Sequence, residues 1–402
     1  MTALSKGKSY KKELDKDVIH SMHKTLLGGE RDFPPAWGNQ GLTFREQGMR
    51  CGLLQHEGGP CGVLAAVQAF VLRHLLMDEN APPSLADVPP EAAGEALVGA
   101  LSHIIWSARM GRLANVVVCK RPALPPLREA VGELICTECK SLDDVTAAVR
   151  AAIGAFMKPP GVAMLLYSLL LTRGIAMVQR DADFPATLIA PNGYCAQELV
   201  NLLLIGRAHS NVFDGEQMLG DALAGEGARL RGIPRRSPVG FLTLFERQGE
   251  PGSLLQVGAN LKRPQSAVFV LQSESHYSVF WAPGPAPDLE MPKEDDGGPV
   301  DGMEGYGDPE AAAAKGAANG HDDNFGDGSA AAFRFDGTFD GAFDLMYFDQ
   351  MAEANEPTRL TLRRRPDNAP PPDYHLVPPL ENVLLTRWPA AALDWNGHEV
   401  IL

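Results

Sequence analysis

One stretch of the sequence decides the fold, and it reads Gln55-His56-Glu57-Gly58-Gly59-Pro60-Cys61-Gly62-Val63-Leu64-Ala65-Ala66-Val67-Gln68-Ala69-Phe70. Apolar residues then recur at helical spacing, at Leu64, Val67, Val71 and Leu75. This period predicts a helix that buries one face. Pro60 suits the first helical position, where its missing N–H costs nothing. The sequence therefore places the thiol of Cys61 in the first turn, at the mouth of the helix.

The position of Cys61 favours a reactive thiolate. The N–H groups of a first turn and the helix dipole both stabilise an anion. A buried structural cysteine is the commoner alternative, but glycines crowded around a core cysteine would have no packing purpose. Gln55, six residues earlier, could donate from its amide to an oxyanion beside the Cys61 N–H. The alternative for Gln55 is an ordinary polar loop residue.

A candidate base lies more than two hundred residues downstream. The runs Ala267 to Leu271 and Tyr277 to Trp281 predict two strands, with His276 at the start of the second. A cysteine followed by a distant histidine is the order found in papain-like enzymes. A purely structural histidine is the alternative. For a third residue that orients His276, Asp344 and Ser278 are both candidates, and neither spacing is diagnostic.

Four stretches in the same order carry a family resemblance. The run from Gln55 to Ala69 resembles the active-site segment of the MINDY deubiquitinases, which are cysteine proteases that cut ubiquitin chains. The other three stretches are Asn192-Gly193-Tyr194-Cys195 through Leu199 to Ala208, Glu274-Ser275-His276-Tyr277-Ser278-Val279, and Asp394-Trp395-Asn396-Gly397. The chain looks most like the larger subgroup, whose members end in a Trp-Asn-Gly segment.

The resemblance implies a fold and an activity. The expected fold is α+β and papain-like, of the MINDY type, with a helical part and a mainly antiparallel sheet. The implied reaction is hydrolysis of isopeptide bonds in polyubiquitin, with a preference for chains joined through lysine forty-eight of ubiquitin. Cys61 would be the nucleophile, His276 the base and later the acid, and Gln55 an oxyanion donor. No cofactor and no metal are implied.

The implied partners are polyubiquitin chains or ubiquitinated proteins, and no nucleic acid or membrane is expected. Two alternatives belong to other classes. The chain could be a catalytically inactive ubiquitin-chain binder, although Gln55, Cys61 and His276 are all present. It could also be a papain-like amidase or transglutaminase with another substrate.

The resemblance implies one MINDY-like catalytic domain, and composition predicts an insertion within it. The domain covers residues 10–282 and 342–402, and a low-complexity acidic insertion, predicted to be disordered, covers 283–341. The net charge of the chain is -14, and the segment from Pro283 to Gly328 carries 12 acidic and 2 basic residues. Most of the acidity therefore belongs to the insertion. Its aspartates lack the spacing of a calcium-binding EF-hand loop.

Other signals bear on location and metal binding. The apolar run from Gly161 to Leu171 is shorter than the roughly 18 residues of a membrane span. The lysine-rich start, Met1 to Lys12, has no apolar core typical of a secretory signal. With six cysteines and no dense disulfide framework, these features predict a cytoplasmic or nuclear protein. Cys136 and Cys139 form a CxxC pair, but no second pair completes a zinc site.

Periodicity also predicts further elements along the chain. Helices are expected over Tyr10 to Leu27, Ala96 to Leu113, Ser141 to Met157, Gly161 to Thr172 and Ala196 to Ile205. Strands are expected over Asn115 to Cys119, Gly240 to Phe245, Leu254 to Gly258, Ala342 to Phe348 and Thr358 to Arg363.

Overall fold

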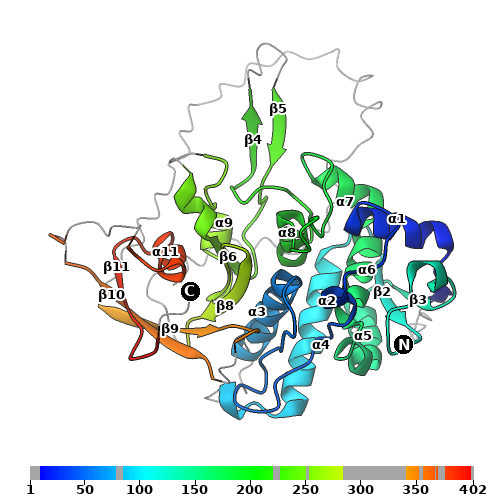
Figure 1. The fold of residues 1–402 in the computed structure, drawn as a ribbon, viewed down its shortest axis with the longest axis horizontal. Coiled ribbons are helices and arrows are strands. Elements are labelled where there is room, and N and C mark those ends of the chain that lie inside the picture. The colour runs from blue at the N-terminus through cyan, green and yellow to red at the C-terminus, as the bar shows by residue number, and fades with distance from the viewer. Residues whose placement is uncertain are drawn as a thin grey trace, which may run out of the picture.

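The computed structural model describes residues 10–77, 85–220, 227–249, 253–283, 341–352, 356–366, 368–369 and 376–399. Helices and strands are largely segregated, with a large sheet towards one end of the molecule and most helices towards the other (Figure 1). This arrangement is the α+β class that the sequence predicts. The insertion predicted at 283–341 lies almost wholly outside the described residues, so the domain division stays a prediction.

The large sheet is six-stranded within the described residues, in the order β11-β10-β9-β8-β7-β6. All neighbouring strands pair antiparallel except β6 and β7, which are parallel. The expected mainly antiparallel sheet is therefore confirmed. Its strands are β6 (Gly240–Thr243), β7 (Val268–Ser273), β8 (His276–Trp281), β9 (Ala342–Phe348), β10 (Thr358–Arg364) and β11 (Ala391–Asp394).

The helical part packs around a smaller sheet in the order β1-β3-β2. These strands are β1 (Tyr10–Glu13), β2 (Ala114–Cys119) and β3 (Leu134–Cys139), and the helices are α1 (Lys16–Leu27), α2 (Pro35–Gly38), α3 (Cys61–Met77), α4 (Pro90–Ser107), α5 (Leu142–Phe156), α6 (Gly161–Arg173), α7 (Ile175–Asp181) and α8 (Gln197–Ile205). A ribbon of β4 (Glu216–Leu219) and β5 (Ala228–Arg231) projects from the body in Figure 1, and α9 (Ala259–Lys262) and α11 (Pro379–Leu385) accompany the large sheet. The 3-10 turns are η1 (Leu85–Asp87), η2 (Leu127–Glu129) and η3 (Leu244–Gln248).

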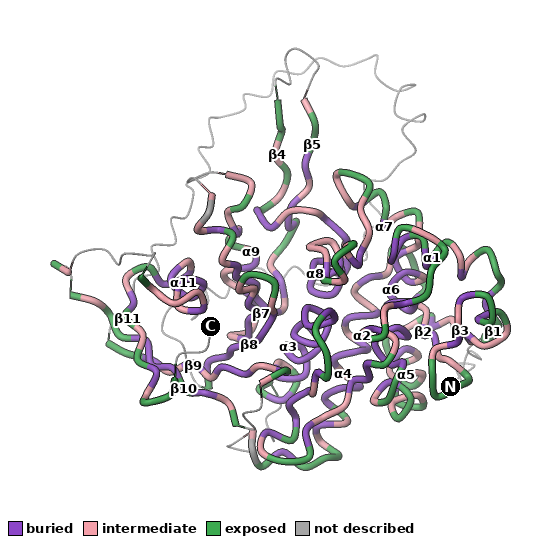
Figure 2. Tube along the Cα trace, in the orientation of Figure 1, coloured by how far each residue is buried: buried purple, intermediate pink, exposed green. Residues whose placement is uncertain are grey.

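Helix α3 joins the two parts. It contacts β7 and β8 of the large sheet on one side, and α4 and α8 on the other. Residues 61–72 are buried without exception, as the purple trace of α3 in Figure 2 shows. The expectation that only one face is buried is therefore wrong. The small residues Ala65, Ala66 and Ala69 explain this, because they let neighbouring elements pack closely around the helix.

The first predicted helix is too long at its start. Tyr10–Glu13 is strand β1, which pairs with β3, and α1 begins only at Lys16. The boundary is set by Asp15, whose carboxylate accepts the Val18 N–H at 2.9 Å and so caps the helix. This pairing with a strand more than 120 residues away has no local signature.

Of the other predicted helices and strands, one helix begins earlier than expected, one strand is a turn, and most are confirmed. Helix α4 runs from Pro90 to Ser107, earlier than expected, because a proline is well placed in the first turn of a helix. The run from Leu254 to Gly258 forms a turn rather than a strand, with Gln256 N donating to Ser253 O at 3.1 Å. Helices α5, α6 and α8 and strands β2, β7, β8, β9 and β10 are confirmed to within a few residues.

Helix α6 is almost completely buried, as its apolar sequence predicts. Among the described residues, no single helix is both long and apolar enough to cross a membrane. Helices α6 and α7 reach that length only as a pair, and they are bent by 84° where they meet.

The Trp-Asn-Gly segment near the chain end has a structural role. Asn396 and Gly397 both adopt positive φ angles, of 53° and 83°. The Asn396 amide donates to Arg359 O on β10 at 2.8 Å, and the Trp395 indole donates to the Glu381 carboxylate on α11 at 2.5 Å. The segment therefore ties the edge strand β11 to its neighbours.

Candidate active site

The turn before α3 holds Cys61 at the helix N-terminus. Gly59 has a φ of 126°, a value that residues with a side chain rarely adopt, and a Cβ there would lie 3.0 Å from the Trp37 indole nitrogen. Pro60 precedes the first helical residue, Cys61, one position earlier than expected. The Cys61 side chain is only 2% exposed. Its sulfur lies 3.8 Å from the Ser275 carbonyl oxygen, so the turn before β8 lies directly beside it.

His276 is the first residue of β8, as predicted. It pairs with Ser273 across the β7–β8 turn, in which Glu274 has a positive φ of 54°. Its ring nitrogen Nε2 lies 2.9 Å from Asp349 Oδ2, and the ring lies near enough to the Cys61 side chain to interact with it electrostatically. The structure thus brings together two side chains that are 215 positions apart in the sequence.

The His276 imidazole is held in its charged form. Partial burial lowers its pKa, but the hydrogen bond to Asp349 and the interaction with the Cys61 side chain outweigh this and raise the pKa from 6.5 to about 10. Since Nε2 faces the carboxylate, Nδ1 is the nitrogen left for the thiol. The ring therefore lies beside a sulfur at a helix N-terminus, which is the setting of a nucleophilic cysteine.

Asp349 is the third residue of this cluster, and the sequence did not identify it. It follows the last residue of β9, and its carboxylate accepts the Met351 N–H through Oδ1 at 2.8 Å. The Arg45 guanidinium donates to the Asp349 carbonyl at 3.2 Å and to the Ala352 carbonyl at 2.7 Å. These contacts fix the loop, so the carboxylate points at the His276 ring.

The two candidates named for this position have other partners. Asp344, five residues earlier on β9, accepts a hydrogen bond from the Thr361 hydroxyl at 2.7 Å. Ser278 on β8 is hydrogen-bonded to Tyr347. Both were therefore wrong for the orienting role. The available signal was the antiparallel pairing of β8 with β9, which aligns Val279 with Phe348 and so carries the next residue, Asp349, towards the start of β8.

Gln55 lies on the segment leading into α3 and is 4% exposed. Its backbone N–H donates to Gln350 O at 3.0 Å, which connects it to the loop that carries Asp349. The side-chain Nε2 donates to Glu57 O at 2.7 Å. An amide nitrogen carries two hydrogens, so one remains for an oxyanion. The structure thus ties Gln55 to the same loop that orients His276.

The CxxC pair is built into the small sheet. Cys136 and Cys139 are three residues apart on β3, so their side chains point to opposite faces of the strand. Among the described residues, no group of three or more His, Cys, Asp or Glu side chains is close enough to hold a metal ion.

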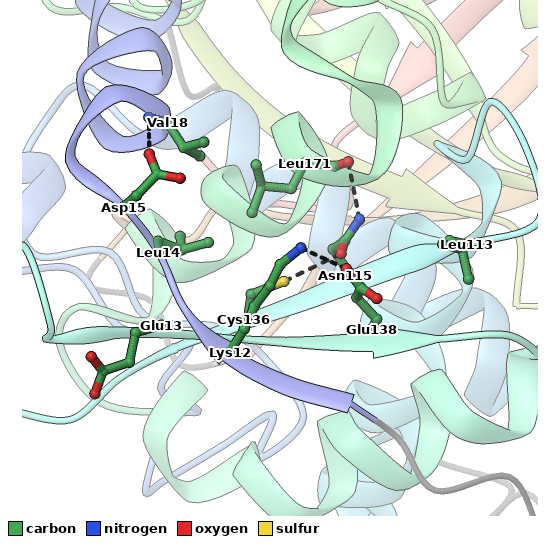
Figure 3. Close-up of a pocket in the computed structure, with 10 residues that line it drawn as sticks. All are labelled: Lys12, Glu13, Leu14, Asp15, Val18, Leu113, Asn115, Cys136, Glu138 and Leu171. Atoms are coloured by element: carbon green, nitrogen blue, oxygen red, sulfur yellow. Dashed lines mark hydrogen bonds and ion pairs between the residues drawn. The ribbon is translucent and has the colours of Figure 1, made fainter.

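One described cavity lies away from Cys61. It has a volume of about 260 Å³, and its lining includes Lys12, Asn115, Cys136, Glu138 and Leu171 (Figure 3). Its polar groups satisfy one another: Lys12 pairs with Glu138 at 2.6 Å, and the Asn115 amide donates to Leu171 O at 3.0 Å. This cavity includes none of the candidate site residues.

A thiol at the N-terminus of a central helix, an imidazole on the facing sheet and a carboxylate behind it define a papain-like cysteine protease fold. The family model for "Deubiquitinating enzyme MINDY-3/4, conserved domain" matches residues 23–285 and 336–397. The chain belongs to this MINDY-3/4 family.

Several curated relatives resemble the chain over most of its length. The "Probable ubiquitin carboxyl-terminal hydrolase MINDY-4" of Xenopus tropicalis is 32% identical over 379 residues, which cover 92% of this chain and 44% of the relative. The human protein of the same name is 33% identical over 405 residues, covering 97% and 47%. The "Ubiquitin carboxyl-terminal hydrolase MINDY-3" of Bos taurus is 32% identical over 275 residues, covering 60% and 59%.

The chain therefore spans about half the length of the MINDY-4 relatives it matches. No solved structure matches the chain significantly.

Proposed function

We propose that the chain is a cysteine-dependent deubiquitinase that hydrolyses isopeptide bonds in polyubiquitin. The observation that carries the proposal is the grouping of Cys61, His276 and Asp349 at the N-terminus of α3, in which the His276 ring is hydrogen-bonded to Asp349 and interacts with the Cys61 side chain. Family membership supports it, because the names of the MINDY-3 and MINDY-4 relatives describe ubiquitin carboxyl-terminal hydrolases.

In the proposed mechanism, the Cys61 thiolate attacks the carbonyl carbon of the last glycine of ubiquitin. The negative charge that develops on the carbonyl oxygen is stabilised by the Cys61 N–H and the Gln55 amide. The His276 imidazolium donates its proton to the departing lysine amine, which leaves a thioester on Cys61. Water then hydrolyses the thioester, with neutral His276 as its base.

Asp349 contributes by orienting the ring. Its hydrogen bond to Nε2 keeps Nδ1 directed at the sulfur and stabilises the imidazolium, as the carboxylate of a catalytic triad does. The residues needed are therefore all supplied by the chain, and the mechanism requires no cofactor.

The finer proposal concerns linkage. By resemblance to the MINDY family, we expect chains joined through lysine forty-eight of ubiquitin to be preferred. A panel of tetra-ubiquitins of defined linkage, incubated with wild type and with Cys61→Ala, tests both the deubiquitinase activity and the linkage preference. Cleavage of the lysine-forty-eight chain by wild type alone supports both. Equal cleavage of all linkages by wild type alone supports the activity and contradicts the preference.

A ubiquitin probe with a C-terminal electrophile separates the alternatives. Labelling of wild type that is lost in Cys61→Ala supports the deubiquitinase. Chain binding without labelling points to an inactive ubiquitin binder instead. Absence of both points to a papain-like amidase with another substrate.

We also propose that the protein works in the cytoplasm or nucleus. All six cysteines are free thiols in the structure, as expected in a reducing compartment. Fractionation of cells that express the tagged chain tests this, and recovery in a secretory fraction would contradict it.

A further inference from the structure

A second sulfur lies at the same helix N-terminus as Cys61. Cys195 is buried just before α8, and its sulfur lies 3.7 Å from the Gly59 carbonyl oxygen. The Cys61 sulfur lies 3.9 Å from the same oxygen. Two thiols from distant parts of the chain therefore share one acceptor.

The backbone next to Cys61 is shaped to admit Cys195. A Cβ on Gly62, the residue after Cys61, would lie 2.8 Å from Cys195 Sγ and 3.1 Å from Cys195 Cβ. These distances are too short for any side chain, so the cysteine packs directly against the first turn of α3.

The turn before α8 is fixed on both sides. The indole of Trp37 donates to Gly193 O at 2.8 Å, and Cys195 forms a β-bridge with Ile189. The closeness of the two thiols therefore follows from the packing of α3 against this turn.

The two thiols differ in reactivity. Cys61 lies at the N-terminus of α3 beside the His276 ring, the setting in which a cysteine is oxidised most readily by peroxides. Burial raises the pKa of Cys195 and keeps it a neutral thiol. The environment thus assigns the first oxidation to Cys61, with Cys195 as the thiol that contacts the same Gly59 carbonyl oxygen.

We propose that hydrogen peroxide converts Cys61 and Cys195 into a reversible disulfide that switches the active site off. The proposal rests on the reactive thiolate of the proposed function, and its assay below does not depend on ubiquitin. In the first step the Cys61 sulfur attacks a peroxide oxygen and the O–O bond breaks. This gives a sulfenic acid on Cys61 and one water, once the leaving hydroxide has taken up a proton from the His276 imidazolium.

In the second step the Cys195 sulfur displaces the hydroxyl group of the sulfenic acid. The sulfur–sulfur bond forms, and the Cys195 proton leaves with the hydroxyl as a second water. Overall, two thiols lose two electrons and one peroxide becomes two waters. Both side chains must rotate away from Gly59 O before the two sulfurs can reach the S–S bond length of roughly 2.05 Å. Once the disulfide has formed, the Cys61 sulfur can no longer act as the nucleophile beside His276. Dithiothreitol reverses the reaction by thiol exchange.

Peptide mapping of the wild-type protein tests the bond itself. The protein is treated with hydrogen peroxide, quenched with catalase, alkylated and digested without reductant. We expect a peptide pair joined through Cys61 and Cys195 that disappears after dithiothreitol. The other cysteines serve as internal controls, since Cys136 and Cys139 point to opposite faces of β3. Oxidation of Cys61 to sulfinic acid without any joined peptide would overturn the proposal.

Cys195→Ser tests the protective role of the second thiol, with Cys136→Ser as a matched buried control. The readout is the fraction of Cys61 that iodoacetamide modifies after peroxide and then dithiothreitol. Wild type and Cys136→Ser should recover most of this reactivity, whereas Cys195→Ser should recover at least tenfold less because its sulfenic acid oxidises further. Full recovery in Cys195→Ser would contradict the proposal.

These readouts separate this proposal from the proposed function. A joined peptide in a protein that cleaves no ubiquitin leaves the disulfide standing and removes the deubiquitinase. Ubiquitin cleavage without a joined peptide supports the deubiquitinase and removes the disulfide. If Cys195→Ser fails to fold, the wild-type peptide map still decides.

Discussion

His276 Nε2 lies 2.9 Å from Asp349 Oδ2, and this contact joins the start of β8 to the end of β9. The carboxylate is itself held by the Met351 N–H, and its loop by Arg45. The contact explains why the imidazole remains protonated although it is partly buried, and it makes Asp349 the residue on which ring orientation depends.

Asp349→Asn should reduce kcat by about 10²-fold, because an amide neither stabilises the imidazolium nor fixes the tautomer. The measurement is cleavage of a ubiquitin substrate at saturating concentration. Asp344→Asn is the matched control, since Asp344 lies on β9, the strand that leads to Asp349, but contacts Thr361. We expect the control to remain within about twofold of wild type. Equal losses in the two variants would remove the orienting role.

The pH dependence follows from the raised pKa of His276. Folding favours the imidazolium, so the stability it contributes is fully present below its ordinary pKa of 6.5 and is lost as the pH rises towards about 10. Because the imidazolium also protonates the leaving amine, kcat/KM should fall on the alkaline side with a midpoint near pH 10.

Asp349→Asn provides the test of that assignment. Removing the carboxylate takes away the largest interaction that raises the His276 pKa, so the alkaline midpoint should move to lower pH. The pH profile of kcat/KM is recorded for both proteins in the same buffers. An unchanged midpoint would mean that a group other than His276 controls the alkaline fall of kcat/KM.

Gln55→Ala should lower kcat by about 10²- to 10³-fold with little change in KM, as expected for the loss of an oxyanion donor. Alkylation of Cys61 by iodoacetamide forms no oxyanion, so its rate should change little. Gln68→Ala is the control. Gln68 is a buried glutamine that accepts the Leu53 N–H at 2.6 Å, and its loss should cost about 1–3 kcal/mol of unfolding free energy instead. Similar kinetics in both variants would argue against the role of Gln55.

The sequence was sufficient for the parts of the site that local chemistry determines. The start of α3 is predicted by Gly59, Pro60 and the apolar period after Cys61. The start of β8 is predicted by the apolar run after His276. Both are properties of a few neighbouring residues. The same local reasoning identified the N-cap of α5, where Ser141 Oγ accepts the Asp144 N–H at 3.1 Å.

Asp349 was missed because its role depends on strand pairing. Its position relative to His276 is set by the register of β8 against β9, and residues 282–341 separate these strands in the sequence. Asp344 lies five residues earlier, within β9, and is equally acidic, so composition does not distinguish the two. β1 was missed for the same reason, since only its contact with the distant strand β3 makes it a strand.

Gly59→Ala should slow alkylation of Cys61 and lower the melting temperature. The φ of 126° is unfavourable for alanine, and the added Cβ would meet the Trp37 indole at 3.0 Å and Gly193 O at 3.2 Å. Gly58→Ala is the neighbouring control, because a Cβ there has no atom within 4 Å. If both variants alkylate at the wild-type rate, the turn does not set the position of the thiol.

Asp181→Ala should destabilise the fold by about 3–5 kcal/mol, because it leaves the Arg173 guanidinium buried without its partner. The two side chains are each 6% exposed and form paired hydrogen bonds of 2.6 and 2.7 Å across the bend between α6 and α7. Asp181 also accepts the Ala208 N–H at 3.0 Å, which connects the bend to the end of α8. Urea unfolding of both variants measures the change. Glu95→Gln, which removes the exposed pair with Arg150, should leave the free energy of unfolding almost unchanged, because solvent screens the pair. Equal costs in the two variants would show that burial does not determine the strength of the Arg173 pair.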